Sequence, residues 1–327
     1  MSRIVAPRPV AASGVLLIDK PAGLTSHDVV ARIRRAAGTR KVGHAGTLDP
    51  MATGLLIVGI GSSTRLLTYI VGADKEYEGT IRLGQSTTTD DAEGKIIATA
   101  ETRLLDALDS AGLQAGIRKL TGDIQQVPSS VSAIKVDGKR AYARVRAGEQ
   151  VELPARPVTV SEFEITGGPR RVPTDAGLVC DVDVRVQCSS GTYIRSLARD
   201  LGSDQGVGGH LTALRRTRVG PFGIDESTAL ESLQDSASVA RARIGPADVA
   251  TRLFGAVRLT ADQAVDLGHG KRIGLDEGSI PSRGGTGGPF AALAPDGRLV
   301  GLVEFQSGQG RTVVNFPADE FETGADA

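Results

Sequence analysis

A glycine-rich segment that runs into an unbroken apolar stretch constrains the fold of this chain more than any other feature. Residues 41–61 read KVGHAGTLDPMATGLLIVGIG. The apolar run from Leu55 to Ile60 is typical of a strand that is covered on both faces. Gly43 and Gly46 let the backbone approach a ligand closely, and Pro50 disfavours helical backbone angles at Asp49. The segment therefore predicts that Asp49 lies on a loop mounted on the core, where functional residues are often found.

The rest of the pattern predicts an α+β fold with a largely antiparallel mixed sheet flanked by helices. Apolar residues alternate with polar ones from Tyr77 to Leu83, as a half-buried strand requires. Helices and strands follow one another without the regular alternation of a parallel α/β protein. Helices are predicted from Ser26, as the cap, to Gly38, from Leu104 to Leu120, and from about Ser196 to Gly202.

Changes in composition along the chain predict three parts. We expect a flexible tail over residues 1–13, a large catalytic domain over 14–250 and a small β-rich domain over 254–320. In the last part Thr260 is suited to cap a helix through Leu267. Pro295, Asp296 and Gly297 separate two apolar runs, which predicts a hairpin.

The composition favours a cytoplasmic protein. The chain has 327 residues and contains neither an apolar run of membrane-spanning length nor a hydrophobic signal core near its start. Its cysteines, Cys180 and Cys188, fall on one face of a predicted strand about 26 Å apart, too far to bridge one another. We therefore expect both to be small core residues in a reducing compartment.

The formal net charge of zero excludes a chain that coats nucleic acid indiscriminately, since such binding needs a large excess of Lys and Arg. Local basic clusters could still form a surface for one defined RNA, although a solvated charged face explains any single cluster equally well. Three clusters occur: Arg32, Arg34, Arg35, Arg40 and Lys41; Lys135, Lys139, Arg140, Arg144 and Arg146; and Arg215, Arg216 and Arg218.

Several segments resemble one known family. GHAGTLDPMATG, around Asp49, closely resembles the central motif of the bacterial TruB-type tRNA pseudouridine synthases. The segments GVLLIDKPAGLTSH, CSSGTYIRSLARDLG and HLTALRRTRVGPF are similar to other motifs of that family. QVPSSVSAIKVDGKRAY also resembles a segment of that family but departs from it at two positions, with Ser129 where a second proline is usual and Val131 where an aromatic residue is usual. Together the matches span about the first two-thirds of the chain, far more than a short motif.

This resemblance implies a pseudouridine synthase catalytic domain followed by a PUA-like C-terminal domain. The implied reaction converts uridine to pseudouridine at position 55 in the T loop of tRNA, after the base is flipped out of its stack. The implied partner is tRNA, through its T loop and acceptor stem, and help with tRNA folding is a further role in the family. We expect a monomer that needs no cofactor, guide RNA or membrane.

The resemblance also implies the site residues, each of which has an ordinary structural alternative. Asp49, Arg195 and Tyr77 match catalytic positions: the aspartate as nucleophile or base, the arginine as the cation that keeps it ionised, and the tyrosine stacked on the base. Packing in the core explains Tyr77 equally well. The implied substrate-binding residues are His44, which fills the space left by the flipped nucleotide, together with Tyr77, Tyr193, Leu214 and Lys20.

The chemistry agrees with a site that holds no metal. Moving a base from a nitrogen to a carbon linkage on the same sugar requires no electrons from outside, and the chain has no phosphate-binding or dinucleotide motif. Its four histidines, His27, His44, His210 and His269, do not fall into metal-ligand spacing with the cysteines. TTTDDAEG has the composition but not the ligand order of a calcium loop, so we interpret it as a polar loop.

Two other functions fit the same sequence features. One is a protein that remodels tRNA without chemistry as its main use, and the other is a synthase of ribosomal RNA that works with guide RNA and partner proteins. An unrelated hydrolase fits poorly because a convincing second catalytic carboxylate is missing. The sequence does not decide whether Asp49 attacks the base, attacks the sugar or removes a sugar proton.

Overall fold

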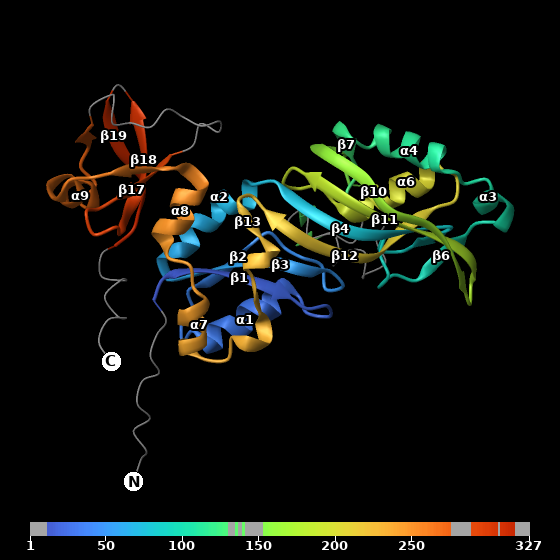
Figure 1. Ribbon diagram of the computed structural model, residues 1–327, viewed down its shortest axis with the longest axis horizontal. Helices are drawn as coiled ribbons and strands as arrows, with labels where there is room; N and C mark the ends of the chain where they lie inside the picture. The colour runs from blue at the N-terminus through green and yellow to red at the C-terminus, as the bar shows by residue number, and fades with distance from the viewer. Residues whose placement is uncertain are drawn as a thin grey trace, which may run out of the picture. The chain divides into compact units, whose positions relative to one another are not determined.

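The chain folds into two units, each built around antiparallel strands (Figure 1). The structure is a computed structural model and describes residues 12–129, 135–136, 139–140, 153–275, 289–306 and 308–317. Unit 1 comprises Met1–Asp49, Gly54–Val71 and Gly220–Ala327, and unit 2 comprises Pro50–Thr53 and Gly72–Val219.

The first sheet strands of unit 1 surround the apolar run found in the sequence. The strands are β1 (Gly14–Lys20), β2 (Val42–Ala45), β3 (Thr53–Ile60), β13 (Phe222–Gly223) and β14 (Thr228–Ala229). β1 pairs antiparallel with β3, β2 pairs antiparallel with the last four residues of β3, and β14 runs parallel to β1. Leu55, Leu56, Ile57, Val58 and Ile60 are each 0% exposed, which confirms a strand covered on both faces.

Helix α1 (Ser26–Ala36) begins at a different cap from the one predicted. Thr25 is the cap: its hydroxyl accepts a hydrogen bond from the Asp28 amide at 3.1 Å, and the Asp28 carboxylate accepts one from the Thr25 amide at 2.9 Å. Ser26 is buried instead and bonds to the backbone of Leu48. The prediction was wrong by one residue because both side chains can cap, and only packing decides which one faces the core.

Unit 1 continues with short helices before its second sheet. These are η1 (Gly61–Leu66), α2 (Leu67–Gly72), η2 (Ile224–Glu226), η3 (Leu230–Ser232), α7 (Ser236–Ala242) and α8 (Pro246–Phe254). α7 contacts both α1 and β1, so that α1 and α7 lie together against the first strands (Figure 1).

A five-stranded sheet near the end of the chain confirms the predicted β-rich part. It consists of β15 (Ala256–Arg258), β16 (Ile273–Gly274), β17 (Phe290–Leu293), β18 (Leu299–Gln306) and β19 (Gln309–Asn315), in the order β15-β17-β18-β19-β16. β17 and β18 form the predicted hairpin. Thr260 caps helix α9 (Ala261–Gly268), as expected, and Leu267 packs with Val257 and Val303 in the core of this part.

Unit 2 is built on five antiparallel strands in the order β12-β4-β11-β10-β7. They are β4 (Lys75–Leu83), β7 (Gly122–Gln126), β10 (Arg156–Thr174), β11 (Gly177–Cys188) and β12 (Gly209–Val219); two short hairpins are β5 (Gln85–Thr87) with β6 (Ile96–Thr99), and β8 (Lys135–Val136) with β9 (Lys139–Arg140). In β4, Tyr77, Ile81 and Leu83 are buried while Glu78 is exposed, as the predicted alternation requires.

The helices of unit 2 differ in one respect from the prediction. They are α3 (Thr102–Asp106), α4 (Ser110–Lys119) and α6 (Ile194–Asp204). The single helix predicted from Leu104 to Leu120 is broken, because Asp109 caps a new helix by accepting a hydrogen bond from the Gly112 amide at 2.7 Å. α4 packs against β10 and α6 (Figure 1).

Both cysteines lie on β11 and are free and buried, as predicted. Burial raises the pKa of Cys188 to about 11, with Thr192 and Lys75 acting in the opposite direction.

Within the described ranges no helix is both long and apolar enough to cross a membrane. The helices and the mixed, largely antiparallel strands of both units confirm the predicted α+β class.

Candidate active site

Asp49 lies on the connection between β2 and β3, a hairpin whose strands pair His44 with Val58. Gly46 has φ 83°, a left-handed angle that suits glycine. Leu48 is only 3% exposed, and its backbone N–H and C=O are both bonded to the Ser26 hydroxyl, at 2.9 and 3.2 Å. The residue before Asp49 is therefore anchored to α1, and this anchor fixes the backbone from which the half-buried Asp49 side chain extends.

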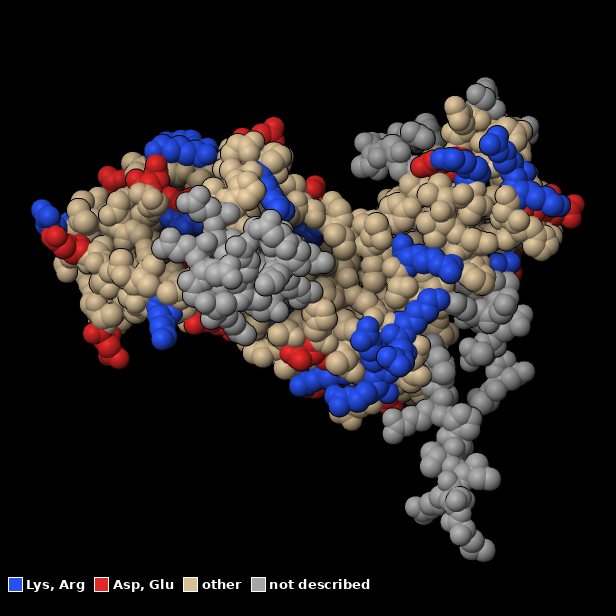
Figure 2. All heavy atoms as spheres, turned by 180° about the vertical axis from the view of Figure 1, so that it is seen from behind, with Lys and Arg blue, Asp and Glu red and all other residues tan. Residues whose placement is uncertain are grey.

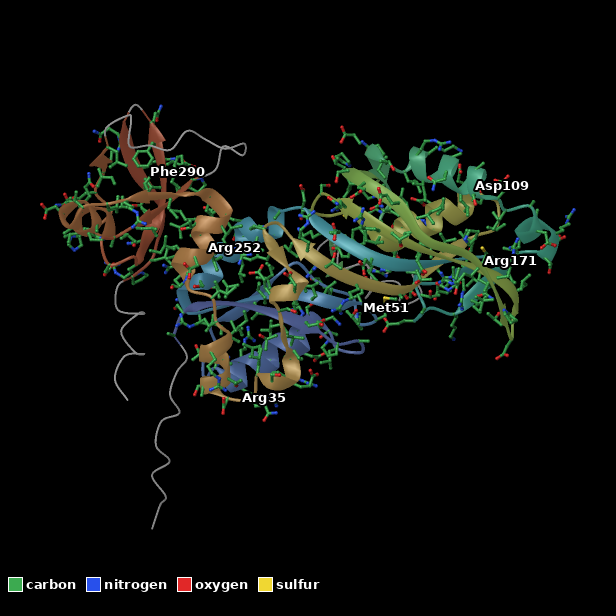
Figure 3. All side chains as sticks on the ribbon, in the orientation of Figure 1. Arg35, Met51, Asp109, Arg171, Arg252 and Phe290 are labelled. Carbon is green, nitrogen blue, oxygen red and sulfur yellow. The ribbon has the colours of Figure 1, made fainter. Side chains whose placement is uncertain are left out.

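The far end of the same loop is held within unit 2. Figure 3 labels Met51, which lies two residues after Asp49 in the chain. Thr53 then makes two long contacts with β12, one to the Leu214 carbonyl at 3.5 Å and one from Arg215 at 3.4 Å. These contacts attach the end of the loop to the strand that carries Leu214.

His44 and Lys20, two predicted substrate-binding residues, both lie in unit 1 with Asp49. The His44 ring is half-buried and packs edge-on against His27, with 5.5 Å between the ring centroids. Lys20 is 0% exposed, and its ammonium donates to the carbonyls of Pro21 and Leu24 at 2.9 and 2.8 Å. These bonds hold the turn that precedes α1, and a contact of Lys20 with substrate stays a prediction.

Arg195 lies in the first turn of α6 and is 5% exposed. Its Nη1 atom donates to the Thr89 carbonyl at 3.0 Å and pairs with Asp91 Oδ2 at 3.3 Å. Asp91 is itself only 2% exposed and also accepts a hydrogen bond from the Glu93 amide at 3.0 Å. The structure thus brings a buried carboxylate to the arginine that the sequence singled out.

Asp91 is the residue that sequence reasoning missed. It belongs to the TTTDDAEG segment, which begins at the last residue of β5 and ends before β6, and whose composition predicts only a polar loop. The segment is polar, but the Thr89 hydroxyl and the Glu93 amide both donate hydrogen bonds to the Asp91 carboxylate, and that carboxylate is buried. A single buried carboxylate in a loop has no periodic signal, so only the adjacent acidic pair could have indicated it.

Asp90, the residue before Asp91, has a carboxyl pKa above its ordinary value. Burial raises the pKa of Asp90, while Ser129, Arg199 and Arg195 act to lower it. It has φ 59°, and it is the one non-glycine residue of the described ranges with a left-handed backbone angle. The backbone of the loop that holds Arg195 therefore has an uncommon conformation at Asp90.

The predicted pocket residues of unit 2 lie on two neighbouring strands and one helix end. Tyr77 on β4 is 9% exposed, and Leu214 on the adjacent β12 is 6% exposed and opposite Gly79. Tyr193 precedes α6, and its backbone N–H and C=O are both bonded to the side chain of Gln126, at 2.8 and 3.1 Å. The sheet thus positions Tyr77 and Leu214, while Gln126 fixes the chain that leads to Arg195.

The three basic clusters have different surroundings. All five side chains of the first cluster, on α1 and just after it, are exposed, and Figure 2 shows Lys and Arg gathered on that face of unit 1. Arg35 points away from the helix (Figure 3). The side chains of the second cluster lie outside the described residues, as does Val131.

The third cluster is not an exposed patch. Arg216 is 1% exposed, and Arg218 bonds to Gln187 at 3.2 Å. Near Arg216, Lys75 is also buried, and burial together with the charge of Arg216 lowers the pKa of Lys75 to about 8. In the described residues, no group of three or more His, Cys, Asp or Glu side chains is placed to hold a metal ion.

Comparison with family models gives matches over most of the chain. Residues 34–194 match the N-terminal domain of the TruB family of pseudouridylate synthases. Residues 195–252 match a tRNA pseudouridylate synthase B C-terminal domain, and residues 254–317 match the C-terminal part of tRNA pseudouridine synthase II.

Curated relatives match along almost their whole length. The tRNA pseudouridine synthase B of Leifsonia xyli is 61% identical over 94% of this chain and 98% of its own. The protein of that name from Thermobifida fusca is 57% identical over 93% and 99%.

Solved structures share the fold at lower identity. A Cbf5-Nop10-Gar1 complex has a chain that is 25% identical, with TM-score 0.67 over 93% of this chain and 84% of its own. An H/ACA RNP bound to a substrate RNA containing 2'-deoxyuridine has a chain that is also 25% identical, with TM-score 0.66 over 95% of this chain and 87% of its own.

Proposed function

This chain belongs to the TruB family of pseudouridine synthases, and on that premise we propose that it converts the uridine at position 55 in the T loop of tRNA to pseudouridine. That the enzyme forms pseudouridine in tRNA follows from the family and from relatives that match over almost the whole chain. The single observation that supports the finer assignment is the Asp49 loop, a carboxylate on a hairpin anchored to a buried strand.

Asp49 would act at the reacting nucleoside. The reaction breaks the bond from N1 to the sugar, turns the uracil and joins C5 to the same carbon, so C5 loses a proton and N1 gains one. A carboxylate can attack the sugar, attack the base or remove a sugar proton, and each route requires it to be ionised. Arg195 would supply the cation, and Asp91 and the Thr89 carbonyl orient its guanidinium.

The buried aromatic and apolar residues of unit 2 would bind the flipped base. A uracil outside its stack needs a dry pocket and a flat partner. Tyr77 would stack on it and take the proton from C5, with Tyr193 and Leu214 as further walls. His44 would occupy the space left in the RNA, while Lys20 would act through the turn that precedes α1.

The RNA would be recognised by its folded shape. The exposed cluster on and after α1 gives unit 1 a positive face suited to phosphates, and the β-rich part over 254–320 would hold the acceptor stem. We propose that the protein acts on tRNA as a monomer without cofactor or guide RNA; the relatives at 61% and 57% identity are named for tRNA and for pseudouridine formation, which supports the choice of substrate. The catalytic domain would cover residues 14–250; of the tail predicted before it, residues 1–11 lie outside the described residues.

The direct test is release of tritium from an unmodified tRNA transcript labelled at C5 of uridine, followed by mapping of the modified position. The purified protein alone should release label from one uridine, in the T loop. Asp49→Asn keeps the shape of the side chain and removes its charge, so it should bind tRNA normally and release no label. A transcript with cytidine at position 55 is the substrate control.

Each alternative gives a different result. Conversion only after addition of guide RNA would favour the ribosomal RNA enzyme. If neither protein converts the transcript while both bind it and speed its folding, the proposal of T-loop catalysis is wrong and remodelling is the function. We expect Asp49→Asn to retain any effect on tRNA folding, because binding does not need the carboxylate.

A further inference from the structure

Helix α6 carries a second arginine, Arg199, four residues after Arg195 and therefore on the same side of the helix. Arg199 makes three separate polar contacts. Nη2 donates to the Val127 carbonyl at 2.8 Å, Nη1 contacts Asp90 Oδ2 at 3.4 Å, and Nε donates to Asp200 Oδ1 at 2.8 Å. Its planar fork thus reaches two segments that are far apart in the sequence.

The first of these segments is the loop that holds Arg195. Thr89 and Asp91 each provide an acceptor for the Arg195 guanidinium, and Asp90 lies between them in the chain. Asp90 has φ 59°, a conformation that residues other than glycine rarely adopt. A side-chain contact that holds Asp90 therefore also holds the residues on either side of it.

The second segment begins at Gln126, the last residue of β7, and continues to Ser129. Gln126 bonds to both backbone groups of Tyr193, Val127 accepts from Arg199, and the Ser129 hydroxyl donates to the Thr89 carbonyl at 3.2 Å. This segment, the loop before β6 and the start of α6 therefore form a closed circuit of hydrogen bonds. Arg199 touches both of the other members of this circuit from the helix.

The charges around Asp90 determine how firmly Arg199 holds the loop. Arg199 and Arg195 face the Asp90 carboxylate and favour its ionised form, with help from Ser129. Burial and Asp200 favour the protonated form, and the sum raises the pKa of Asp90. A protonated Asp90 loses its charge-assisted contact with Arg199.

We propose that Arg199 is a positioning residue for pseudouridine formation: it fixes the Thr89–Asp91 backbone, and that backbone holds the Arg195 guanidinium in place. This inference rests on the proposed function. Arg199 need not touch the RNA, because its effect passes through Asp90 to Thr89 and Asp91, which bond to Arg195. A shift of about 1 Å in a catalytic group is enough to lower a rate by about a hundredfold.

The test compares Arg199→Gln, Arg199→Lys and Asp90→Asn with wild type in single-turnover tritium release, with tRNA affinity measured separately. Arg199→Gln should slow the step about tenfold or more with tRNA affinity within about twofold of wild type. Lysine keeps the charge but cannot reach all three partners, so Arg199→Lys should recover part of the rate.

Arg252→Gln is the matched control. Arg252, on α8 (Figure 3), is 30% exposed where Arg199 is 29%, and it also contacts a carboxylate, Glu226, and a backbone carbonyl, Pro221. Its loss removes a similar set of contacts, to Glu226 and Pro221 of unit 1. We expect the rate of Arg252→Gln to equal that of wild type.

The pH profile separates positioning from general loss of structure. In wild type the rate should fall at acidic pH as Asp90 is protonated, and this limb should move to higher pH in Arg199→Gln, because a cation that favours the carboxylate is gone. In Asp90→Asn that limb should be absent.

A rate for Arg199→Gln within twofold of wild type would overturn the inference, as would equal losses in Arg199→Gln and Arg252→Gln. If Arg199→Gln does not fold, an unchanged rate in both Arg199→Lys and Asp90→Asn would overturn it in the same way. A wild-type protein that releases no label refutes the proposed function instead, so the two failures are distinct.

Discussion

Replacing Asp91 by asparagine measures how strongly the buried carboxylate holds Arg195. Both side chains are almost fully buried, at 6% and 3% exposure for the arginine and the aspartate. Removing one partner of a buried ion pair costs about 3–5 kcal/mol because the other charge is left uncompensated. Here the 3.3 Å contact is long for a charge-assisted bond, and asparagine keeps a carbonyl oxygen. We therefore expect a loss of about 2–3 kcal/mol, below that range.

Urea unfolding followed by circular dichroism checks the stability part. With a urea dependence of about 1–3 kcal/mol per M, the midpoint of the transition that reports unit 2 should fall by about 1 M. Midpoints are preferable to free energies because a chain with two units need not unfold in one step. In single-turnover tritium release under conditions where the variant is folded, we expect the rate to fall by about a hundredfold.

Asp181→Asn is the control for the loss of a carboxylate from the same unit. Asp181 pairs with Arg82 through two bonds of 2.8 Å, and that arginine is 23% exposed. We expect a loss of about 1 kcal/mol there, since solvent screens the charge that remains, and an unchanged rate. Equal rates for Asp91→Asn and Asp181→Asn would refute the reasoning that Asp91 positions Arg195.

Three further variants test other parts of the structure. Ser26→Ala removes both bonds to Leu48, so we expect about 1–2 kcal/mol less stability in urea and a slower single turnover, without weaker tRNA binding. Cys188→Ala tests pH dependence: a folded pKa of about 11 against an ordinary 9.0 means that the wild-type thiol stabilises the fold below pH 9 and loses this contribution as the pH rises toward 11. The urea midpoint of Cys188→Ala should therefore fall less than that of wild type between pH 9 and 11. Thr260→Ala removes a capping box and should lower the melting temperature of the β-rich part by the equivalent of about 1 kcal/mol, with the tritium-release rate unchanged.

Much of the fold could be predicted because burial imposes a period on the sequence. The alternation in β4, the apolar run in β3, the hairpin of β17 and β18 and the start of α9 were all predicted from residues close together in the chain. The loop position of Asp49 followed in the same way from its glycines, its proline and the strand after it. The errors at Ser26 and near Asp109 lie where two polar residues could each end or begin a helix.

The candidate site depended more on tertiary structure. Local pattern and the resemblance named Asp49, Tyr77 and Arg195, and their roles stay predictions. Neither identified the contact of Arg195 with Asp91 or that of Arg199 with Asp90, because these contacts join segments that lie about a hundred residues apart. A carboxylate in a polar loop has the same sequence signal whether it faces solvent or a buried guanidinium.

The sequence by itself determined the strands β3 and β4, the hairpin of β17 and β18, the loop that displays Asp49 and the family, since each depends on residues close in the chain or on long matching motifs. Only the tertiary structure decided which polar side chains are buried and what they hold: Ser26 on Leu48, Asp91 on Arg195 and Gln126 on Tyr193. The physical reason is that a hydrogen bond between distant segments exists only after the sheet and α6 have brought them together, and burial then makes that bond necessary.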